Sequence, residues 1–393
     1  MKPRRSILSA RAGVILALWL AAQPAGAQDA GLTALVDQSL AAMNGEKWQE
    51  SLDLSSAAVA RFGKDGPLKR FGPQFGALYY RKGVCEMKLG KWSEAMRSFE
   101  TCYRDFPNEG DERGNVFQKL ALLKWGEAAM GAEDWPLAAG QFRKFLSERD
   151  KVRDSFPHGV FYINLAVCQY RLGNIPEGNE NLEIAIYNKQ RFPTPEAGII
   201  AGFEALVTTA VAKRKEQALT DFLARNRGEL VVEPCVMQRY SPVFLKLAGD
   251  AVAADMTRAA LAIYQLVPST QAALDDARAR LANCADPAEK KLLESDITAL
   301  EAALEGGNGP EMIRLAAVAL IHEKHGNVRG AFAAYQQLEL YFPKARNREE
   351  NLFNLVRTSS LVAGSDRARG HAETFIRDFP ASPRVAELKS LMR

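Results

Sequence analysis

The chain has few of the side chains that most often carry out chemistry. Its 393 residues include four histidines and five cysteines. It has no Cys-x-x-Cys pair, no Gly-x-Ser-x-Gly elbow and no glycine-rich loop followed by Lys-Ser or Lys-Thr. Acidic residues lie beside Lys and Arg on polar helix faces, where charges usually solvate the surface. We therefore predict that the protein is not an enzyme and uses neither a metal nor a cofactor.

One histidine pair invites comparison with a metal site. His322 and His325 flank Glu323 and Lys324. A zinc-protease helix carries its two histidines four residues apart, so that both face one metal. These two are three apart and have no third ligand in view. We interpret them as solvated residues near a helix end.

Long apolar runs are also scarce. The run Ala12–Ala22 is 11 residues long, too short to cross about 30 Å of hydrocarbon at about 1.5 Å per residue, which disfavours a membrane anchor. It lies between basic residues and a small-residue cleavage signal, namely Lys2, Arg4, Arg5, Arg11 and Ala25-Gly26-Ala27. This pattern predicts a Sec-type signal peptide, residues 1–27, cleaved after Ala27. No cysteine follows the run, so no lipobox is expected and the predicted location is the periplasm.

A surplus of basic charge is missing once this leader is set aside. The chain has 51 basic and 47 acidic residues, and four of the basic ones lie in residues 1–27, which leaves 47 of each sign. Nucleic-acid binding and attachment to acidic membrane surfaces both depend on a basic surplus. We predict neither partner. We also expect no transmembrane segment in the exported chain, because the next most apolar stretch, Ala197–Ala212, contains Glu204.

A Phe-Pro pair is present five times. With 19 Phe and 18 Pro, a random order would give about one such pair. Two of the intervals are close to the length of one helix-turn-helix repeat, so the count favours a repeated architecture. The pairs are Phe106-Pro107, Phe156-Pro157, Phe192-Pro193, Phe342-Pro343 and Phe379-Pro380.

The clearest unit shows a fixed spacing of small and aromatic residues. Gly83 is followed by Ala95 after 12 residues, by Phe99 after four more, by Cys102 after three and by Pro107 after five. Small residues let two helices approach closely, and proline ends the second helix. This spacing resembles the tetratricopeptide repeat. The resemblance implies an all-α protein, a right-handed superhelical solenoid of antiparallel helix-turn-helix repeats.

Tryptophans mark the starts of second helices. Trp92 and Trp135 are placed at these starts, as Trp48 is in a weaker first unit, and we interpret the tryptophans as core-like.

The same spacing recurs along the chain and predicts its division into domains. The predicted domains are a signal peptide (1–27), an N-terminal array (28–268, divergent at 194–240), a charged helical hairpin with a glycine-rich break (269–310), and C-terminal repeats with a capping helix (311–393). Matching positions are Gly126, Ala138, Phe142 and Phe145; Ala166, Gly178, Leu182 and Ala185; Ala248, Ala260, Tyr264 and Val267; Ala319, Ala331, Tyr335, Leu338 and Pro343; and Val356, Ala368, Ala372, Phe375 and Pro380.

The hairpin departs from this spacing. Leu293, Ile297, Leu300 and Leu304 form a coiled-coil-like stripe. The hairpin could be a hinge between two arrays or an overlong repeat packed like the others, and the stripe could serve self-association. These alternatives stay open at the level of sequence.

Cys85, Cys102 and Cys168 are expected on apolar helix faces as small buried residues. The odd number leaves at least one thiol unpaired in a monomer. A Cys85–Cys102 bridge is possible, because both residues lie in one predicted helical hairpin.

In tetratricopeptide arrays the first helices of the repeats line the concave side. The resemblance therefore implies a partner-binding surface, which includes Val84, Leu123, Ile163 and Val167 if these are not inter-repeat core. Val84 and Glu127 replace the asparagines of chaperone-tail-binding members, so that partner is not expected. The candidate partner-binding residues are Tyr80, Met87, Lys88, Glu127, Met130, Tyr170 and Arg171.

These features predict a protein- or peptide-binding scaffold. The resemblance is to exported bacterial envelope proteins of this family, which implies a role in assembling an envelope or outer-membrane complex. The alternative is a polysaccharide- or peptidoglycan-binding helical-repeat protein of a glycan transport or processing system. That alternative requires two or three exposed aromatic rings along one surface.

Overall fold

The computed structural model describes residues 30–62, 72–106, 115–147, 157–192, 194–230, 233–362 and 365–391. Within these ranges the backbone forms helices joined by turns, with no strand. The all-α prediction is therefore confirmed. The predicted signal peptide lies outside the described residues, as do Pro107, Phe156, Pro193 and Met392.

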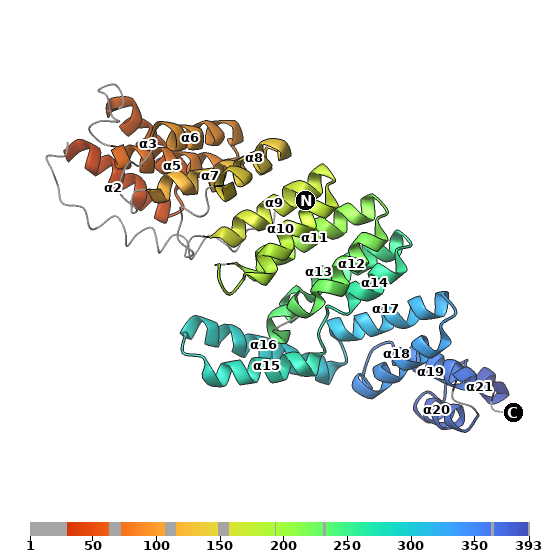
Figure 1. Cartoon of the computed structure of the whole chain (residues 1–393). Helices are drawn as coiled ribbons and strands as arrows, with labels where there is room; N and C mark the ends of the chain where they lie inside the picture. The colour runs from red at the N-terminus through yellow and green to blue at the C-terminus, as the bar shows by residue number, and fades with distance from the viewer. Residues whose placement is uncertain are drawn as a thin grey trace. The chain divides into compact units, whose positions relative to one another are not determined.

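The chain divides into two compact units, and each is an array of paired helices (Figure 1). Unit 1 comprises Met1–Asn174 and Gln190–Thr194, and unit 2 comprises Ile175–Lys189 and Pro195–Arg393. In unit 1, α2 pairs with α3, α5 with α6 and α7 with α8, and each second helix also packs on the next first helix. The helices of unit 1 are α2 (Ala30–Asn44), α3 (Trp48–Phe62), α5 (Gly72–Lys88), α6 (Trp92–Asp105), α7 (Asn115–Gly131), α8 (Trp135–Ser147) and α9 (His158–Leu172).

The first helices of unit 1 end in one recurring turn. Glu46, Gly90, Glu133 and Gly173 have left-handed backbones, with φ between 57° and 86°. In the first turn the Glu46 amide donates to the carbonyl of Met43 at 3.0 Å, and the Lys47 amide donates to that of Ala42 at 2.9 Å. The same two bonds recur in the other three turns. This is the Schellman motif, which satisfies the carbonyls left unpaired at a helix end.

The turn also sets the start of the second helix. Trp48, Trp92 and Trp135 each lie two residues after the left-handed residue and begin α3, α6 and α8. The predicted helix starts at these three tryptophans are confirmed.

Unit 2 repeats the pattern. Arg214, Asp255 and Gly326 are its left-handed turn residues, with φ of 51°, 57° and 69°. The pair α11–α12, in the region expected to be divergent, thus has the same turn as the regular repeats. The helices of unit 2 are α10 (Ile175–Tyr187), α11 (Glu196–Ala212), α12 (Glu216–Leu230), α13 (Pro234–Ala253), α14 (Thr257–Tyr264), α15 (Thr270–Asn283), α16 (Pro287–Gly306), α17 (Pro310–Lys324), α18 (Val328–Tyr341), α19 (Arg348–Val362), α20 (Ser365–Asp378) and α21 (Val385–Leu391).

The helical hairpin α15–α16 is a side branch of unit 2. Beyond it, α17 packs on both α13 and α14, so the stack of repeats continues past the hairpin. Its base is fixed, because the buried Glu311 carboxylate accepts a hydrogen bond from the Thr270 amide at 2.7 Å. Because α15 also packs on α13, the helices before the hairpin contact both the hairpin and the helix that follows it.

The leucine stripe of α16 is used inside the hairpin. Leu293 and Leu300 are buried in one cluster with Ala273, Leu274 and Ala277. Ile297 and Leu304 are partly buried against the same cluster. This packing leaves the stripe unavailable for the self-association considered from sequence.

Phenylalanines of the Phe-Pro pairs close the second helices. Phe106, Phe342 and Phe379 directly follow α6, α18 and α20. Leu388 of the last helix, α21, is fully buried in the same cluster as Phe342. This burial is what a helix that caps the last repeat requires.

All five cysteines are unpaired. The Cys102 thiol donates to the carbonyl of Gly76 at 3.1 Å, whereas Cys85 lies beside Ser51. These different surroundings leave no Cys85–Cys102 bridge. Burial raises the pKa of Cys102 to about 12, as expected for an inert, buried thiol.

Candidate binding surface

The tyrosines of the predicted surface are buried. Tyr80 is 6% exposed and Tyr170 1% exposed. The Tyr80 ring packs against Phe99 and Phe117, with centroids 5.8 and 5.6 Å apart. Burial raises the pKa of Tyr80 to about 12. Large aromatic rings here fill the space between neighbouring helices, so these two residues do not offer a surface to a partner. Leu123 and Ile163 are buried as well.

Methionines recur near the ends of the first helices, where Met87 and Met130 pack against the edges of two core clusters. Met87 and Met130 are half-buried, and so is Met43, at the equivalent place in α2. In all three turns the methionine carbonyl accepts the hydrogen bond from the left-handed residue, at 3.0 Å. The three side chains therefore occupy the same position in three successive repeats of unit 1. Met43 was missed from sequence, although its distance to Trp48 equals that from Met87 to Trp92.

The two predicted cations of the surface stack on tryptophans. The Lys88 ammonium lies 5.4 Å from the Trp48 ring centroid, and the Arg171 guanidinium lies 5.6 Å from that of Trp135. Both cations are exposed. Cation–π contacts of this kind stabilise by about 0.5–1 kcal/mol at exposed sites. Lys88 and Arg171 thus link consecutive repeats of unit 1 as well as facing solvent.

Glu127 is paired within its own helix. Its carboxylate lies 2.6 Å from the Lys124 ammonium. Burial alone would lower the pKa of Lys124, but the neighbouring Glu127 and Tyr80 raise it. Because the two charges cancel, this pair adds little net charge to the surface. The surrounding surface is apolar, and its side chains Val84, Val167, Met87 and Met130 are half-buried.

The tryptophans at the helix starts are partly buried and pack on neighbouring helices. Trp135 packs against the core cluster that contains Phe142 and Phe161. A Cβ added to Gly131 would lie 2.7 Å from the Trp92 ring, so this ring packs on the end of the next first helix.

The histidine pair of α17 contacts different groups. His322 Nδ1 lies 3.1 Å from the Asn327 amide nitrogen, and His325 Nε2 lies 2.9 Å from the Thr257 hydroxyl. Burial and the nearby His325 lower the pKa of His322. Among the described residues no group of three metal-binding side chains comes together.

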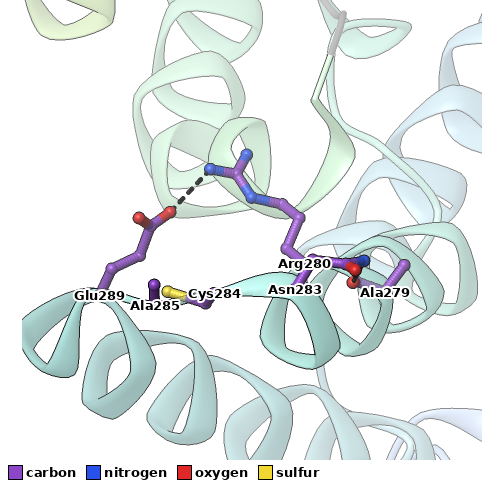
Figure 2. Close-up of a pocket in the computed structure, with 6 residues that line it drawn as sticks. All are labelled: Ala279, Arg280, Asn283, Cys284, Ala285 and Glu289. Carbon is purple, nitrogen blue, oxygen red and sulfur yellow. Dashed lines mark hydrogen bonds and ion pairs between the residues drawn. The ribbon is translucent and has the colours of Figure 1, made fainter.

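A pocket of about 450 Å³ lies at the far end of the α15–α16 hairpin (Figure 2). Figure 2 shows Arg280 reaching toward Glu289, and the two form an ion pair at 3.0 Å. Arg280 also pairs with Glu233 at 2.5 Å. The Cys284 thiol donates to the carbonyl of Asp286 at 3.5 Å. The polar groups of this pocket therefore satisfy one another.

Comparison with known proteins supports the repeat assignment. Residues 77–109 match the model of the tetratricopeptide repeat family, and these residues comprise the unit with the clearest spacing. No curated protein matches the chain in sequence. In the described residues no helix has the length and apolarity needed to cross a membrane.

Several solved structures of repeat proteins are similar to this chain. TPR-like repeats from Podosopora anserina share 16% identity, with a TM-score of 0.40 over 51% of this chain and 96% of that one. A tetratricopeptide repeat protein from Parabacteroides merdae shares 12% identity, with a TM-score of 0.39 over 84% and 99%. The C-terminal part of a TPR repeat-containing protein from Cytophaga hutchinsonii shares 14% identity, with a TM-score of 0.36 over 81% and 99%.

The repeated helix pairs and the matched unit define the class of protein. The described chain is an array of helix-turn-helix repeats, and one of its units, residues 77–109, matches the tetratricopeptide repeat family.

Proposed function

We propose that the protein is a non-catalytic, exported scaffold that binds a protein or peptide along the first helices of unit 1. The observation that carries this proposal is the repeated methionine position, Met43, Met87 and Met130. Methionine is flexible and polarizable, and it suits surfaces that adapt to a partner. Exposed cations stacked on tryptophan flank the row, and Trp and Arg are enriched where binding energy concentrates.

The proposed location is the periplasm, and the proposed role is support of an envelope or outer-membrane complex. Both rest on the leader at residues 1–27. N-terminal sequencing of the protein from fractionated cells should give Gln28 as the first residue. An intact Met1 in the cytoplasmic fraction would contradict export.

Retention of envelope proteins by the immobilised protein tests the binding surface. The variant Met87→Asp with Met130→Asp should lose a partner that the wild type retains, because a carboxylate in a half-buried apolar contact loses hydration. Ser93→Asp with Gly140→Asp adds the same charge at exposed positions of α6 and α8 and serves as the control. Equal retention by both double variants would discard the methionine surface.

The glycan-binding alternative gains one supporting observation, the row of partly exposed tryptophans. Soluble oligosaccharides should then quench tryptophan fluorescence, and retention of glycans without any protein would replace the scaffold proposal.

A further inference from the structure

The turns of unit 1 form an edge with unusual surface composition. We define this turn edge as residues 44–48, 88–92, 131–135 and 171–174. It contains the partly buried Trp48, Trp92 and Trp135 together with two exposed leucines, Leu89 (36% exposed) and Leu172 (41% exposed). Exposed apolar groups that recur along one edge are typical of an interaction surface.

Charge alternates from turn to turn along this edge. The first turn carries Glu46, the second Lys88 and Lys91, the third Glu133 and Asp134, and the fourth Arg171, all of them exposed. None of these side chains has an ion-pair partner among the described residues of the chain. Lys47 of the first turn is instead paired with Glu50 at 3.1 Å. The side chains without an ion-pair partner are therefore negatively charged in the first and third turns and positively charged in the second and fourth.

This order is complementary to itself under a two-fold rotation. An axis between the second and third turns brings the second turn of one copy to the third turn of the other. Lys91 then faces Glu133 twice, and Glu46 faces Arg171 twice. A two-fold interface needs one surface that complements itself in this way.

We propose that the turn edge of unit 1 is a dimer interface between two copies of this chain. Tryptophan rings and leucines lie along its length, and the alternating charges set the antiparallel register. The alternation favours a second copy over an anionic glycan, because the carboxylates between the cations would repel a chain of negative charges. It favours a second copy over a uniformly acidic or basic partner for the same reason. The proposal does not depend on the groove proposed above.

Single charge reversals test the interface. Lys91→Glu places like charges opposite each other at two points of the dimer, and so does Glu133→Lys. Like charges facing each other across an interface are strongly unfavourable. Analytical ultracentrifugation of the purified protein should show a wild-type dimer that weakens as salt screens the charges. Each single variant should dissociate at least about 10-fold more readily.

Mixing the two variants gives the sharpest outcome. Lys91→Glu leaves one cation, Lys88, among the four charges of its second and third turns, and Glu133→Lys leaves one carboxylate, Asp134, among the four charges there. An equimolar mixture should therefore form a heterodimer, although each variant alone is monomeric. Lys215→Glu reverses the charge at the same turn position between α11 and α12 and should leave the dimer unchanged.

Three results would overturn the proposal. These are a wild-type monomer at all concentrations, a dimer that both reversals leave intact, and a mixture that stays monomeric. A monomer whose tryptophan fluorescence is quenched by chitohexaose would assign the edge to a glycan instead. Circular dichroism of each variant checks that the exposed substitutions leave the fold unchanged.

Discussion

Gly126 lies directly against the ring of Phe142. A Cβ at position 126 would be 2.3 Å from the nearest ring atom, a distance that real Cβ atoms do not show. The same relationship joins Gly83 and Phe99, at 2.7 Å. These glycines let the two helices of a pair approach until the ring of the second fills the space beside the first.

Replacing Gly126 with alanine should destabilise the protein. The added methyl group meets a fully buried ring, and overpacking of this kind costs about 1–3 kcal/mol. Urea unfolding measures the change. Gly140→Ala in α8 is the matched control, because nothing lies within 4 Å of its Cβ position. The free energy of unfolding of the control should rise by about 0.5–1 kcal/mol. A lower free energy of unfolding in both variants would contradict the packing argument.

The recurring turn predicts opposite effects at Gly90 and Glu133. Both residues have left-handed backbones, which cost a residue with a side chain about 1–2 kcal/mol. Gly90→Ala should therefore lower the free energy of unfolding by about 1 kcal/mol. Glu133→Gly should raise it or leave it unchanged, since glycine also loses more chain entropy on folding. Stabilisation by Gly90→Ala would show that the turn geometry is wrong.

The buried Cys102 thiol should make stability fall at alkaline pH. Burial raises the pKa of this thiol from 9.0 to about 12 in the folded protein. The unfolded chain loses the proton first, so the stabilisation is complete below pH 9.0 and is lost as pH rises toward about 12. The expected slope is about 1.4 kcal/mol per pH unit. Cys102→Ala should reduce the slope, and an identical slope in variant and wild type would contradict the assignment.

Arg81 is a buried charge whose removal should be tolerated. Its side chain is fully buried in unit 1, where Nη1 donates a hydrogen bond of 2.8 Å to the Val36 carbonyl. Among the described residues, its other two nitrogens, Nε and Nη2, have no hydrogen-bond partner. Burial lowers the pKa of Arg81 to about 10. Replacing buried charges with apolar groups of similar volume is often neutral or stabilising.

Thermal unfolding of Arg81→Met measures this directly. The melting temperature should stay equal or rise. A fall of more than about 2 °C, which corresponds to about 1–2 kcal/mol for a chain of this size, would indicate that the guanidinium stabilises the fold.

The repeat architecture could be predicted because its determinants are local. The distance from Gly83 to Phe99 fixes a small residue opposite a ring, and the tryptophans mark the starts of second helices. Such spacing can be recognised in a sequence even where overall sequence similarity to known repeats is weak. The turn at Arg214 escaped prediction, because a non-glycine residue in a left-handed turn gives no signal in the sequence.

The side branch and the surface could not be predicted in the same way. That α17 packs on α13 and α14 depends on contacts between segments far apart in sequence. The burial of Tyr80 and Tyr170 likewise depends on the neighbouring repeats, since a tyrosine on the first helix can face the groove or the next helix.

The most direct test of the scaffold proposal is retention of envelope proteins by the wild type and by the variant Met87→Asp with Met130→Asp. The account predicts a defined protein partner that the wild type retains and that this variant loses, while Ser93→Asp with Gly140→Asp retains it. The account would be contradicted if the wild type retained only glycans. It would also be contradicted if the wild type and both double variants retained the same proteins.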